Sequence, residues 1–522
     1  MKQTIRKILL MSFFVLPLMA SCGENSSEVV SQSTSSQSSD EIPSVLSEED
    51  TNLDDIKPET FTIYSVNDTH GALEEDATGS SYQAGMANLD WSIKNDPDYT
   101  DYRVLLSAGD MSQGTGISNI SRGQAMMETM NSMRFDAMTI GNHEFDWGID
   151  TIEEMESTAR FPFLGINILN KDDGKLVDFA QASTIVQKGQ LKVGVVGSIY
   201  ANIRSDIFEE MIQDIDFVDD TDLVKNEASR LKTEEKCDIV VVLTHQGGDS
   251  SAVSNWLGDE NISGIFGGHD HLFSEKSNYD NSCYFLEAGS SSKGFTKLTF
   301  ALDDDTGEYY VTSGSFHQLS EYDCMDASSP VVESVVAKWK YIAGKELDEV
   351  VGYRDRDFRK SMIGKMVCDS MIYYAEHECQ IDDIAVAVHN FGGIRAEWDD
   401  DTKNDQGTYD ITYNDIYEVM PFDNKVQMIT LEGSQLITAC NNSYFSSNFT
   451  KDGLDYYAND VKIDRTKTYN VLAIDYMISN KNDACYKGVN QGINLNGVTE
   501  LTRDCIRSFI QDHGTIIGDN YL

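Results

Sequence analysis

The chain has 522 residues, with 40 Lys or Arg against 87 Asp or Glu, so its formal charge at pH 7 is −47. This length allows two or three domains with a large core. The charge disfavours nucleic-acid binding, because no basic stripe is present to release counterions from phosphates. An anionic substrate would need bound cations or a few local arginines to draw it in.

The first segment predicts export from a bacterial cell. Basic residues within the first seven positions precede an apolar stretch, residues 8–19, that is too short for a comfortable membrane span. It ends in Leu-Met-Ala-Ser-Cys, which resembles a lipoprotein processing site, so we interpret residues 1–22 as a signal with lipidation on Cys22. The alternative is cleavage of an ordinary signal peptide, in which Cys22 has no role and carries no lipid. The lipid would anchor the protein to the bacterial cell membrane, facing outside the cytoplasm at the cell surface or in the periplasm.

Residues 23–59 are rich in Ser, Gln, Asn, Asp and Glu, and their apolar residues are too sparse to nucleate a core. We expect them to form a disordered tether. Eight further cysteines are widely spread and form no CxxC pair, so their pairing stays open. Cys237 begins an apolar strand, where a buried free thiol is at least as plausible as a disulfide.

Two domains are expected after the tether. In residues 60–328, short apolar strands alternate with helical segments, which favours an α/β or α+β layered domain. A linker helix is predicted over residues 329–349 because apolar side chains recur there at helical spacing. Residues 350–522 are then expected to form a second α+β domain.

Short polar motifs follow the apolar strands of the first domain. The runs 61–66, 104–106, 137–140, 239–243 and 262–266 each precede one motif, and the motifs are Asp68-Thr69-His70, Gly109-Asp110, Gly141-Asn142-His143-Glu144-Phe145-Asp146, Thr244-His245 and Gly267-Gly268-His269-Asp270-His271. Each motif alone is weak, since it could be a turn, a cap or a buried core histidine. Because strand ends meet at one edge of a sheet, the ordered set predicts a single site there.

The residue types favour two divalent metal ions. A carboxylate such as Asp110, which lies between the other motifs in chain order, can bridge two ions that clamp a phosphoryl group. Mixed nitrogen and oxygen ligands suit Zn, Mn, Co or Fe better than Ca. His143 is our candidate for the general acid, and Asp146, three residues on, could orient its ring.

The motif set resembles the calcineurin-like metallophosphoesterase superfamily. Within it, residues 61–513 resemble the 5′-nucleotidase / UDP-sugar hydrolase family. The resemblance implies a four-layer β-sandwich flanked by helices, with a C-terminal α+β substrate-binding domain on a linker helix. It implies one ion on Asp68, His70, Asp110 and His271, and the other on Asp110, Asn142, His245 and His269. The catalytic pair of the family maps onto His143 and Asp146.

The resemblance is weaker in the C-terminal half. Residues 390–395 look like the phosphate-binding loop of the family, and residues 420–424 and 475–476 look like the segments whose aromatic side chains stack on a base. The implied substrate-binding residues are Asn390, Arg395, Phe422, Asn424, Tyr476, Asp483 and Arg359. Two aromatic rings can sandwich a planar base, and an Arg offers a planar fork to phosphate. Taken alone, Phe422 and Tyr476 would more often be core residues.

Three departures from the family pattern affect the specificity site. Asp357, between Arg356 and Arg359, stands where an Arg is expected. The glycine-rich segment after the second aromatic is replaced by residues 480–485. Phe391 replaces the first glycine of the phosphate loop, which adds bulk near Arg395.

Three functions therefore stay open. The first is a two-metal 5′-nucleotidase that releases phosphate from nucleoside 5′-monophosphates, with UDP-sugars and cyclic nucleotides as further substrates. The second is a phosphoesterase on a different organic phosphate. The third is a non-enzymatic surface-binding protein. In the first two, the partner is a small-molecule phosphate ester, and the oligomeric state is open in all three.

Overall fold

The computed structural model describes residues 56–76, 82–320, 327–399, 402–479, 486, 493–494 and 501–522. Among the helices in these ranges, none is long and apolar enough to cross a bilayer. Cys22, Asp483 and the predicted tether up to residue 55 lie outside the described residues. Residues 56–59 pack against the first domain, where the Gln190 N–H donates to the Ile56 carbonyl at 3.0 Å and the Tyr309 hydroxyl donates to the Pro58 carbonyl at 2.6 Å.

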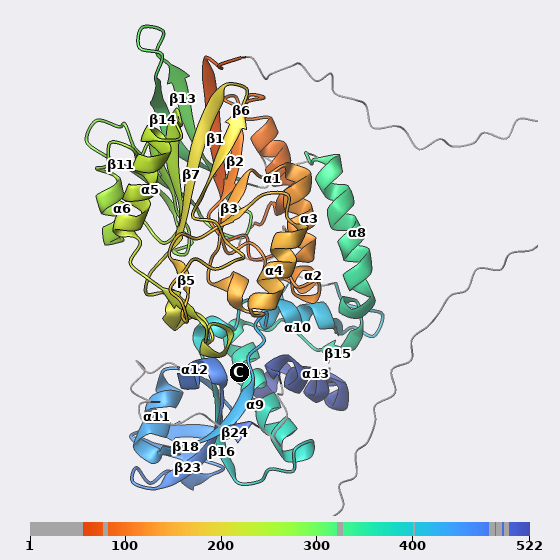
Figure 1. Ribbon diagram of the computed structural model, residues 1–522. Coiled ribbons are helices and arrows are strands. Elements are labelled where there is room, and N and C mark those ends of the chain that lie inside the picture. The colour runs from red at the N-terminus through yellow and green to blue at the C-terminus, as the bar shows by residue number, and fades with distance from the viewer. Residues whose placement is uncertain are drawn as a thin grey trace, which may run out of the picture. The chain divides into compact units, whose positions relative to one another are not determined.

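Two six-stranded sheets form the centre of the N-terminal domain (Figure 1). The first has the order β14-β13-β1-β2-β3-β4, and its strands are β1 (Thr60–Val66), β2 (Val104–Ser107), β3 (Ala137–Thr139), β4 (Phe163–Leu164), β13 (Gly294–Leu302) and β14 (Tyr309–Gln318). The second has the order β11-β12-β10-β9-β7-β6, and its strands are β6 (Ser183–Lys188), β7 (Leu191–Ile199), β9 (Ile239–His245), β10 (Gly264–Phe266), β11 (Phe273–Ser277) and β12 (Tyr284–Ala288).

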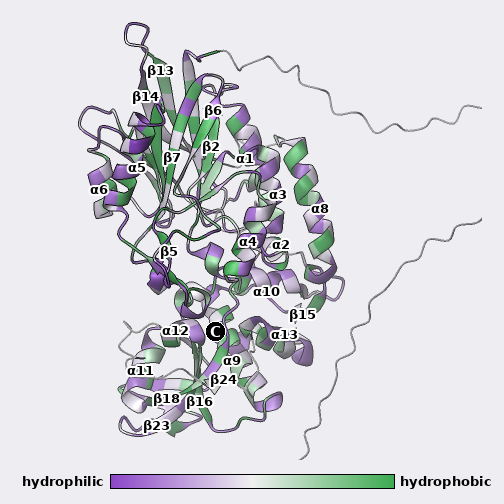
Figure 2. Ribbon diagram, viewed as in Figure 1, coloured by the Kyte–Doolittle hydropathy of each residue, from purple (hydrophilic) through white to green (hydrophobic). Residues whose placement is uncertain are grey.

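The two sheets face each other across one apolar core. Side chains from β1 and β2, such as Phe61 and Leu106, pack in the same buried cluster as Val193 of β7 and Val241 of β9. Strands with both faces covered are mostly apolar, and green predominates along β2 and β7 in Figure 2. A turn at residues 303–308 joins β13 to β14, where the Asp303 N–H donates to the Glu308 carbonyl.

Helices cover the outer faces of this sandwich and complete four layers. The helices near the first sheet are α1 (Gly85–Lys94), α2 (Gly116–Ile120), α3 (Gln124–Met133) and α4 (Ile149–Thr158), and those on the second are α5 (Thr221–Thr233) and α6 (Ser251–Trp256). The small pair β5 (Ile168–Asn170) and β8 (Ile215–Phe217) lies between them in sequence. The predicted α/β class and layered architecture are confirmed.

The C-terminal domain begins after α8 (Pro330–Leu347), which packs on α1, α2 and α3. Its main sheet has the order β19-β16-β23-β18-β24, with β16 (Ile384–His389), β18 (Val426–Glu432), β19 (Tyr444–Phe445), β23 (Thr468–Ile474) and β24 (Ile493–Asn494). Two three-stranded sheets accompany it, made of β15 (Val350–Arg354), β17 (Tyr409–Thr412) and β25 (Thr515–Ile516), and of β20 (Phe449–Asp452), β21 (Asp455–Ala458) and β22 (Val461–Lys462). The helices are α9 (Lys360–His377), α10 (Tyr413–Val419), α11 (Gly433–Asn441), α12 (Asp475–Ser479) and α13 (Thr502–His513).

Candidate active site

The polar motifs meet where strands of both sheets end. The expectation of one sheet edge was wrong, because β1, β2 and β3 belong to the first sheet while β9 and β10 belong to the second. A strand buried on both faces has the same continuous apolar sequence in either sheet, so the pattern could not separate them. The two parallel sets of carboxyl ends nevertheless lie together, and their loops form one site.

The backbone of this site is unusual. The ring-bearing or carboxylate-bearing residues Asp68, His70, Asp110, His269 and His271 all have positive φ, between 48° and 80°. Such values are uncommon for residues with a Cβ and cost free energy, and they cluster at functional sites. Neighbouring glycines let the loops approach closely, since a Cβ on Gly141 would lie 2.2 Å from Asp110 Oδ1.

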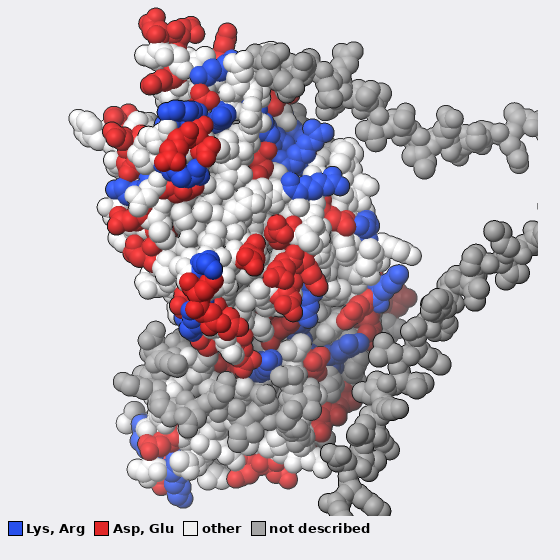
Figure 3. Space-filling view, viewed as in Figure 1, with Lys and Arg blue, Asp and Glu red and all other residues white. Residues whose placement is uncertain are grey.

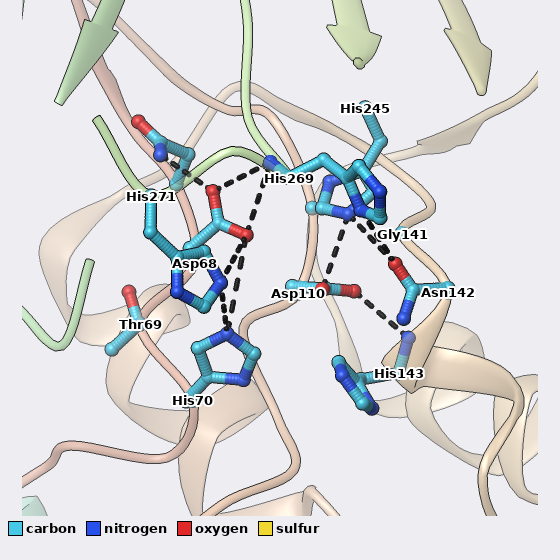
Figure 4. Close-up of polar contacts among 12 residues, drawn as sticks. Asp68, Thr69, His70, Asp110, Gly141, Asn142, His143, His245, His269 and His271 are labelled. Carbon is cyan, nitrogen blue, oxygen red and sulfur yellow. Dashed lines mark hydrogen bonds and ion pairs between the residues drawn. The ribbon is translucent and has the colours of Figure 1, made fainter. Parts of the chain in front are cut away.

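One group of side chains contains Asp68, His70 and His271 (Figure 4). The two ring Nε2 atoms lie 2.9 Å apart, and His271 Nε2 lies 3.4 Å from Asp68 Oδ1. The carboxylate of Asp68 is fully buried and accepts from the side-chain amide of Asn67 at 2.6 Å and from the N–H of His269 at 2.9 Å. These contacts fix the orientation of the carboxylate.

A second group contains Asp110, Asn142, His245 and His269. His245 Nε2 lies 3.1 Å from Asp110 Oδ2 and 3.1 Å from Asn142 Oδ1. His269 Nδ1 is also 3.1 Å from the same amide oxygen. Asp110 lies between the groups, because it is also within 4.8 Å of ligand atoms of His70 and His143.

The tautomers of these rings fit bound cations. His245 Nδ1 lies 2.8 Å from the Ala108 carbonyl, which can only accept, so Nδ1 carries a proton and Nε2 is the nitrogen that faces the oxygens of Asp110 and Asn142. His70 Nδ1 likewise lies 3.2 Å from the Gln113 carbonyl. Burial opposes a charge on His245, but the Asp110 carboxylate outweighs it and raises its pKa to about 10. The site therefore favours positive charge between these atoms, and nitrogen and oxygen ligands of this kind suit Zn, Mn, Co or Fe.

His143 lies beside these groups with its ring held by Asp146. Its Nδ1 is 2.8 Å from Asp146 Oδ2, and its backbone N–H donates to Asp110 Oδ1 at 2.8 Å. Burial disfavours the charged ring, but the carboxylates of Asp146 and Asp110 outweigh burial and raise the pKa of His143 to about 9. With Nδ1 engaged, Nε2 is the nitrogen left to meet a substrate.

The sequence motifs contained one supporting residue to which we had given no role. Glu144 is fully buried, and its carboxylate accepts from the backbone N–H groups of Asp110, Met111 and Gly141, each at 2.9 Å. It ties the loop after β2 to the loop after β3. The sequence signal for this role was the position of an acidic residue, Glu144, among the mostly buried residues of the motif 141–146.

Residues of the C-terminal half complete a cavity of about 630 Å³ in front of His143, here called the His143 cavity. The Phe422 ring lies 5.7 Å from the His143 ring, and the Arg395 guanidinium lies 5.3 Å over Phe422. Asn390, Asn424 and Tyr476 also line the cavity. The structure therefore brings most of the predicted substrate-binding residues to the metal-ligand groups.

Two predicted substrate residues are not among them. Arg359 is exposed at the position before α9 and does not line this cavity, and Asp483 lies outside the described residues. Asp357 is exposed and accepts from Arg354, whose guanidinium stacks on Tyr409. Sequence reasoning missed Trp147 and Phe208, which contribute aromatic walls from the N-terminal domain.

Comparisons with known proteins agree with this geometry. A family model for the calcineurin-like phosphoesterase domain matches residues 61–273, and one for the 5′-nucleotidase C-terminal domain matches residues 335–456. Human 5′-nucleotidase is 26% identical over 430 residues, covering 73% of this chain and 71% of its own. The cell wall protein Lmo0130 of Listeria monocytogenes is 24% identical over 450 residues, covering 74% of this chain and 56% of its own.

A solved structure shares the fold. The 5′-nucleotidase precursor from Thermus thermophilus superposes with a TM-score of 0.68 at 19% identity, covering 88% of this chain and 97% of the other. Calcineurin-like phosphoesterases use two divalent metal ions, which the two groups around Asp110 fit. The chain joins such a domain to a 5′-nucleotidase C-terminal domain and belongs to the 5′-nucleotidase family of calcineurin-like phosphoesterases.

Proposed function

We propose that this phosphoesterase hydrolyses nucleoside 5′-monophosphates, with UDP-sugars and cyclic nucleotides as further substrates. The observation that carries the proposal is the His143 cavity, where members of both metal-ligand groups, a held imidazole, two arginines and four aromatic side chains line one space. Human 5′-nucleotidase, by its name, acts on such nucleotides.

The assigned ligands are Asp68, His70, Asp110 and His271 for one ion, and Asp110, Asn142, His245 and His269 for the other. Two divalent ions, when bound, neutralise phosphoryl charge and activate a water. His143 donates a proton from Nε2 to the leaving oxygen, and Asp146 holds the ring through Nδ1. Arg395 binds the non-bridging oxygens of the phosphate, since its guanidinium offers a fork of donors to them.

Phe422 and Tyr476 are proposed to hold the base between them. Both line the His143 cavity, and Tyr476 also meets Phe208, whose ring centroid is 6.5 Å away. Asn390 and Asn424 supply amide groups for the nucleoside. The departures at Asp357 and Phe391 favour a second candidate, a phosphoesterase on another organic phosphate, because fewer arginines are available to the phosphate than the family pattern implies.

A substrate panel tests the proposal. Adenosine monophosphate, UDP-glucose, a cyclic nucleotide, a sugar phosphate and 4-nitrophenyl phosphate are compared in Mn²⁺, with a chelated sample as the control. We expect the nucleotide to have the highest kcat/KM and the chelator to abolish every activity. Asp110→Ala should lose both ions in metal analysis, because Asp110 lies between the groups. Full activity in metal-free protein would refute the metal assignment, and preference for a sugar phosphate would favour the second candidate.

We also propose that the protein is exported and lipid-anchored through Cys22. The support is the basic start, the short apolar stretch and the Leu-Met-Ala-Ser-Cys sequence of residues 18–22. The Listeria relative is named a cell wall protein, which agrees with a location outside the cytoplasm. Cys22→Ala should move the protein from the membrane fraction to the soluble exported fraction. Unchanged membrane association would refute lipidation at Cys22.

A further inference from the structure

The loop that carries Arg395 follows β16 directly. It consists of residues 390–395, is here called the Arg395 loop, and lines the His143 cavity through Asn390, Gly392, Gly393 and Arg395. Because phosphate binding is assigned to Arg395, whatever fixes this loop also fixes the phosphate site. The last residue of β16, His389, is in contact with the loop and has no role in the mechanism so far.

The His389 side chain is fully buried and meets the Arg395 loop at two places. Its Nδ1 lies 3.1 Å from the carbonyl oxygen of Asn390. A Cβ on Gly393 would lie only 2.3 Å from Cε1 of the ring, so the backbone packs on the imidazole at a distance that glycine alone permits. The ring therefore contacts both ends of the short 3-10 turn Phe391–Gly393.

Hydrogen bonds continue from this turn to the guanidinium. The Asn390 carbonyl also accepts from the Gly393 N–H at 3.2 Å, which closes the turn. Inside the turn, the Gly392 carbonyl accepts from Nη1 of Arg395 at 3.3 Å. The direction of the Gly392 carbonyl thus helps to place the guanidinium, and that direction depends on the turn that His389 contacts.

An imidazole is a costly side chain for this position if it only fills space. Burial lowers the pKa of His389 to about 4, so the ring is neutral at neutral pH. Since the Asn390 carbonyl can only accept, Nδ1 carries the proton and Nε2 is an acceptor. Among the residues that the structure describes, no donor reaches Nε2. A buried acceptor without a donor costs folding free energy that an apolar side chain would not, so stability alone does not account for His389.

We propose that His389 is a positioning residue for phosphate-ester hydrolysis, because its Nδ1–H fixes the turn that places Arg395 for the phosphate. This inference rests on the proposed function, in which Arg395 binds the non-bridging oxygens. His389 does not line the His143 cavity, so it acts through the loop and not by contact with substrate. A binding group that is held in place before substrate arrives lowers KM, while the chemical step at His143 is left largely as it was.

Two substitutions separate the Nδ1–H from the volume of the ring. His389→Leu keeps much of the volume and removes both the donor and the unpaired Nε2. It should raise KM for 4-nitrophenyl phosphate and the inhibition constant of inorganic phosphate roughly fivefold, the equivalent of one hydrogen bond, while kcat changes less than about twofold. Its Tm should equal or exceed that of wild type. His389→Asn carries an amide N–H near the position of Nδ1, so it should recover most of the affinity although its smaller side chain lowers Tm.

A second background and a matched control complete the experiment. Arg395→Met removes the guanidinium, and His389→Leu should then change either constant less than about twofold, because it acts through Arg395. Thr299→Val on β13 also removes a buried polar atom that has no partner in the described part of the chain, and it should change neither constant. His389→Gln carries its amide nearer the position of Nε2, and it replaces His389→Leu as the variant without the donor if the latter does not fold.

The outcomes distinguish this inference from the proposed function. Unchanged constants in the Leu and Gln variants would overturn it, and so would an equal rise in the Arg395→Met background. A rise that accompanies a lower Tm in His389→Leu and is not recovered in His389→Asn would show a purely structural role. In each of these cases wild type still hydrolyses phosphate esters and the proposed function stands. A wild-type protein that hydrolyses none of them would refute the proposed function and this inference with it.

Discussion

His143 shows how one residue can lie among metal ligands and have another role. Its ligand atom is within 4.8 Å of His70 and Asp110, close enough for coordination, yet its Nδ1 is engaged by Asp146. Metal ligation through Nε2 would leave the leaving group without a proton donor. The His143 ring lies 5.7 Å from the Phe422 ring, and the guanidinium of Arg395 lies over Phe422, so the ring is next to residues that line the substrate cavity.

His143→Ala should therefore keep both ions and lose turnover. We expect kcat to fall by roughly 10²–10⁴, the contribution typical of a positioned acid. Metal analysis of the purified variant provides the control. A variant that loses one ion would mean that His143 is a ligand.

Asp220 gives a pH-dependent prediction away from the metals. It is 3% exposed and accepts from the Gln246 side chain at 2.9 Å, and burial raises its pKa to about 6. A carboxyl whose pKa is higher in the folded than in the unfolded state destabilises the fold once it ionises. Its contribution to stability is therefore greatest below about pH 4 and is lost as pH rises to about 6.

Asp220→Asn should remove the loss of folding stability that accompanies ionisation of Asp220. Relative to wild type, the variant should gain up to about 3 kcal/mol in free energy of unfolding at pH 7.5 and little at pH 4. Urea unfolding of both proteins at several pH values gives the difference directly. A difference that does not change with pH would contradict the raised pKa of Asp220.

At the scale of elements, the loop after α10 joins the two domains at the site. The carbonyl of Pro421 accepts from the side-chain amides of Gln113 at 3.0 Å and Asn119 at 2.6 Å, both buried residues of the N-terminal domain. On its other side, Arg503 donates to the carbonyls of Met420 and Phe422. The backbone carbonyl of Gln113 also meets His70. Contacts therefore connect the metal-ligand residue His70, through Gln113, to the loop that carries Phe422.

Gln113→Leu keeps much of the side-chain volume and removes the amide. Because a buried hydrogen bond contributes about 1 kcal/mol, KM for nucleotides should rise roughly fivefold while hydrolysis of 4-nitrophenyl phosphate changes little. Asn119→Leu should act similarly, and the double variant should cost more than the sum, because either amide alone still donates to the Pro421 carbonyl and only the double variant removes both donors. Equal losses on nucleotide and small ester would contradict this positioning role.

The strands and their motifs could be predicted because each signal is local. An apolar run followed by Asp-x-His or Gly-Asn-His is visible within ten residues, and all of the predicted runs are strands. Gln113 supports Phe422 through the carbonyl of Pro421. This contact could not be predicted, because Gln113 and Pro421 are 308 positions apart and neither has a distinctive local pattern. The contact of Phe391 with Tyr444 is hidden for the same reason. The metal-ligand loops were therefore predictable from local patterns, whereas the residues that line the substrate cavity came from the family resemblance and the contacts that hold them could not be predicted.

At the scale of the whole molecule, alternating strands and helices predicted the layered class, and the family resemblance added the division into two facing sheets. The surface charge was evident from composition alone. Figure 3 shows acidic side chains spread over much of the face drawn, with basic residues fewer and interspersed. With a formal charge of −47, the basic residues are too few to compensate all the carboxylates. Their mutual repulsion destabilises the compact state and is reduced by salt.

Stability should consequently rise with ionic strength. At 0.1 M salt the screening length is about 10 Å, so raising NaCl from about 0.02 M to about 0.3 M should weaken repulsion between separated carboxylates and raise Tm by a few degrees. Scanning calorimetry of metal-free protein at pH 7 measures the shift without competition from bound ions. The same series close to the isoelectric point of about 4.3 is the control, because the net charge is then small and the shift should vanish. A Tm at pH 7 that is constant or falls with NaCl would mean that local ion pairs, such as Lys297 with Asp96 and Asp98, outweigh the net repulsion.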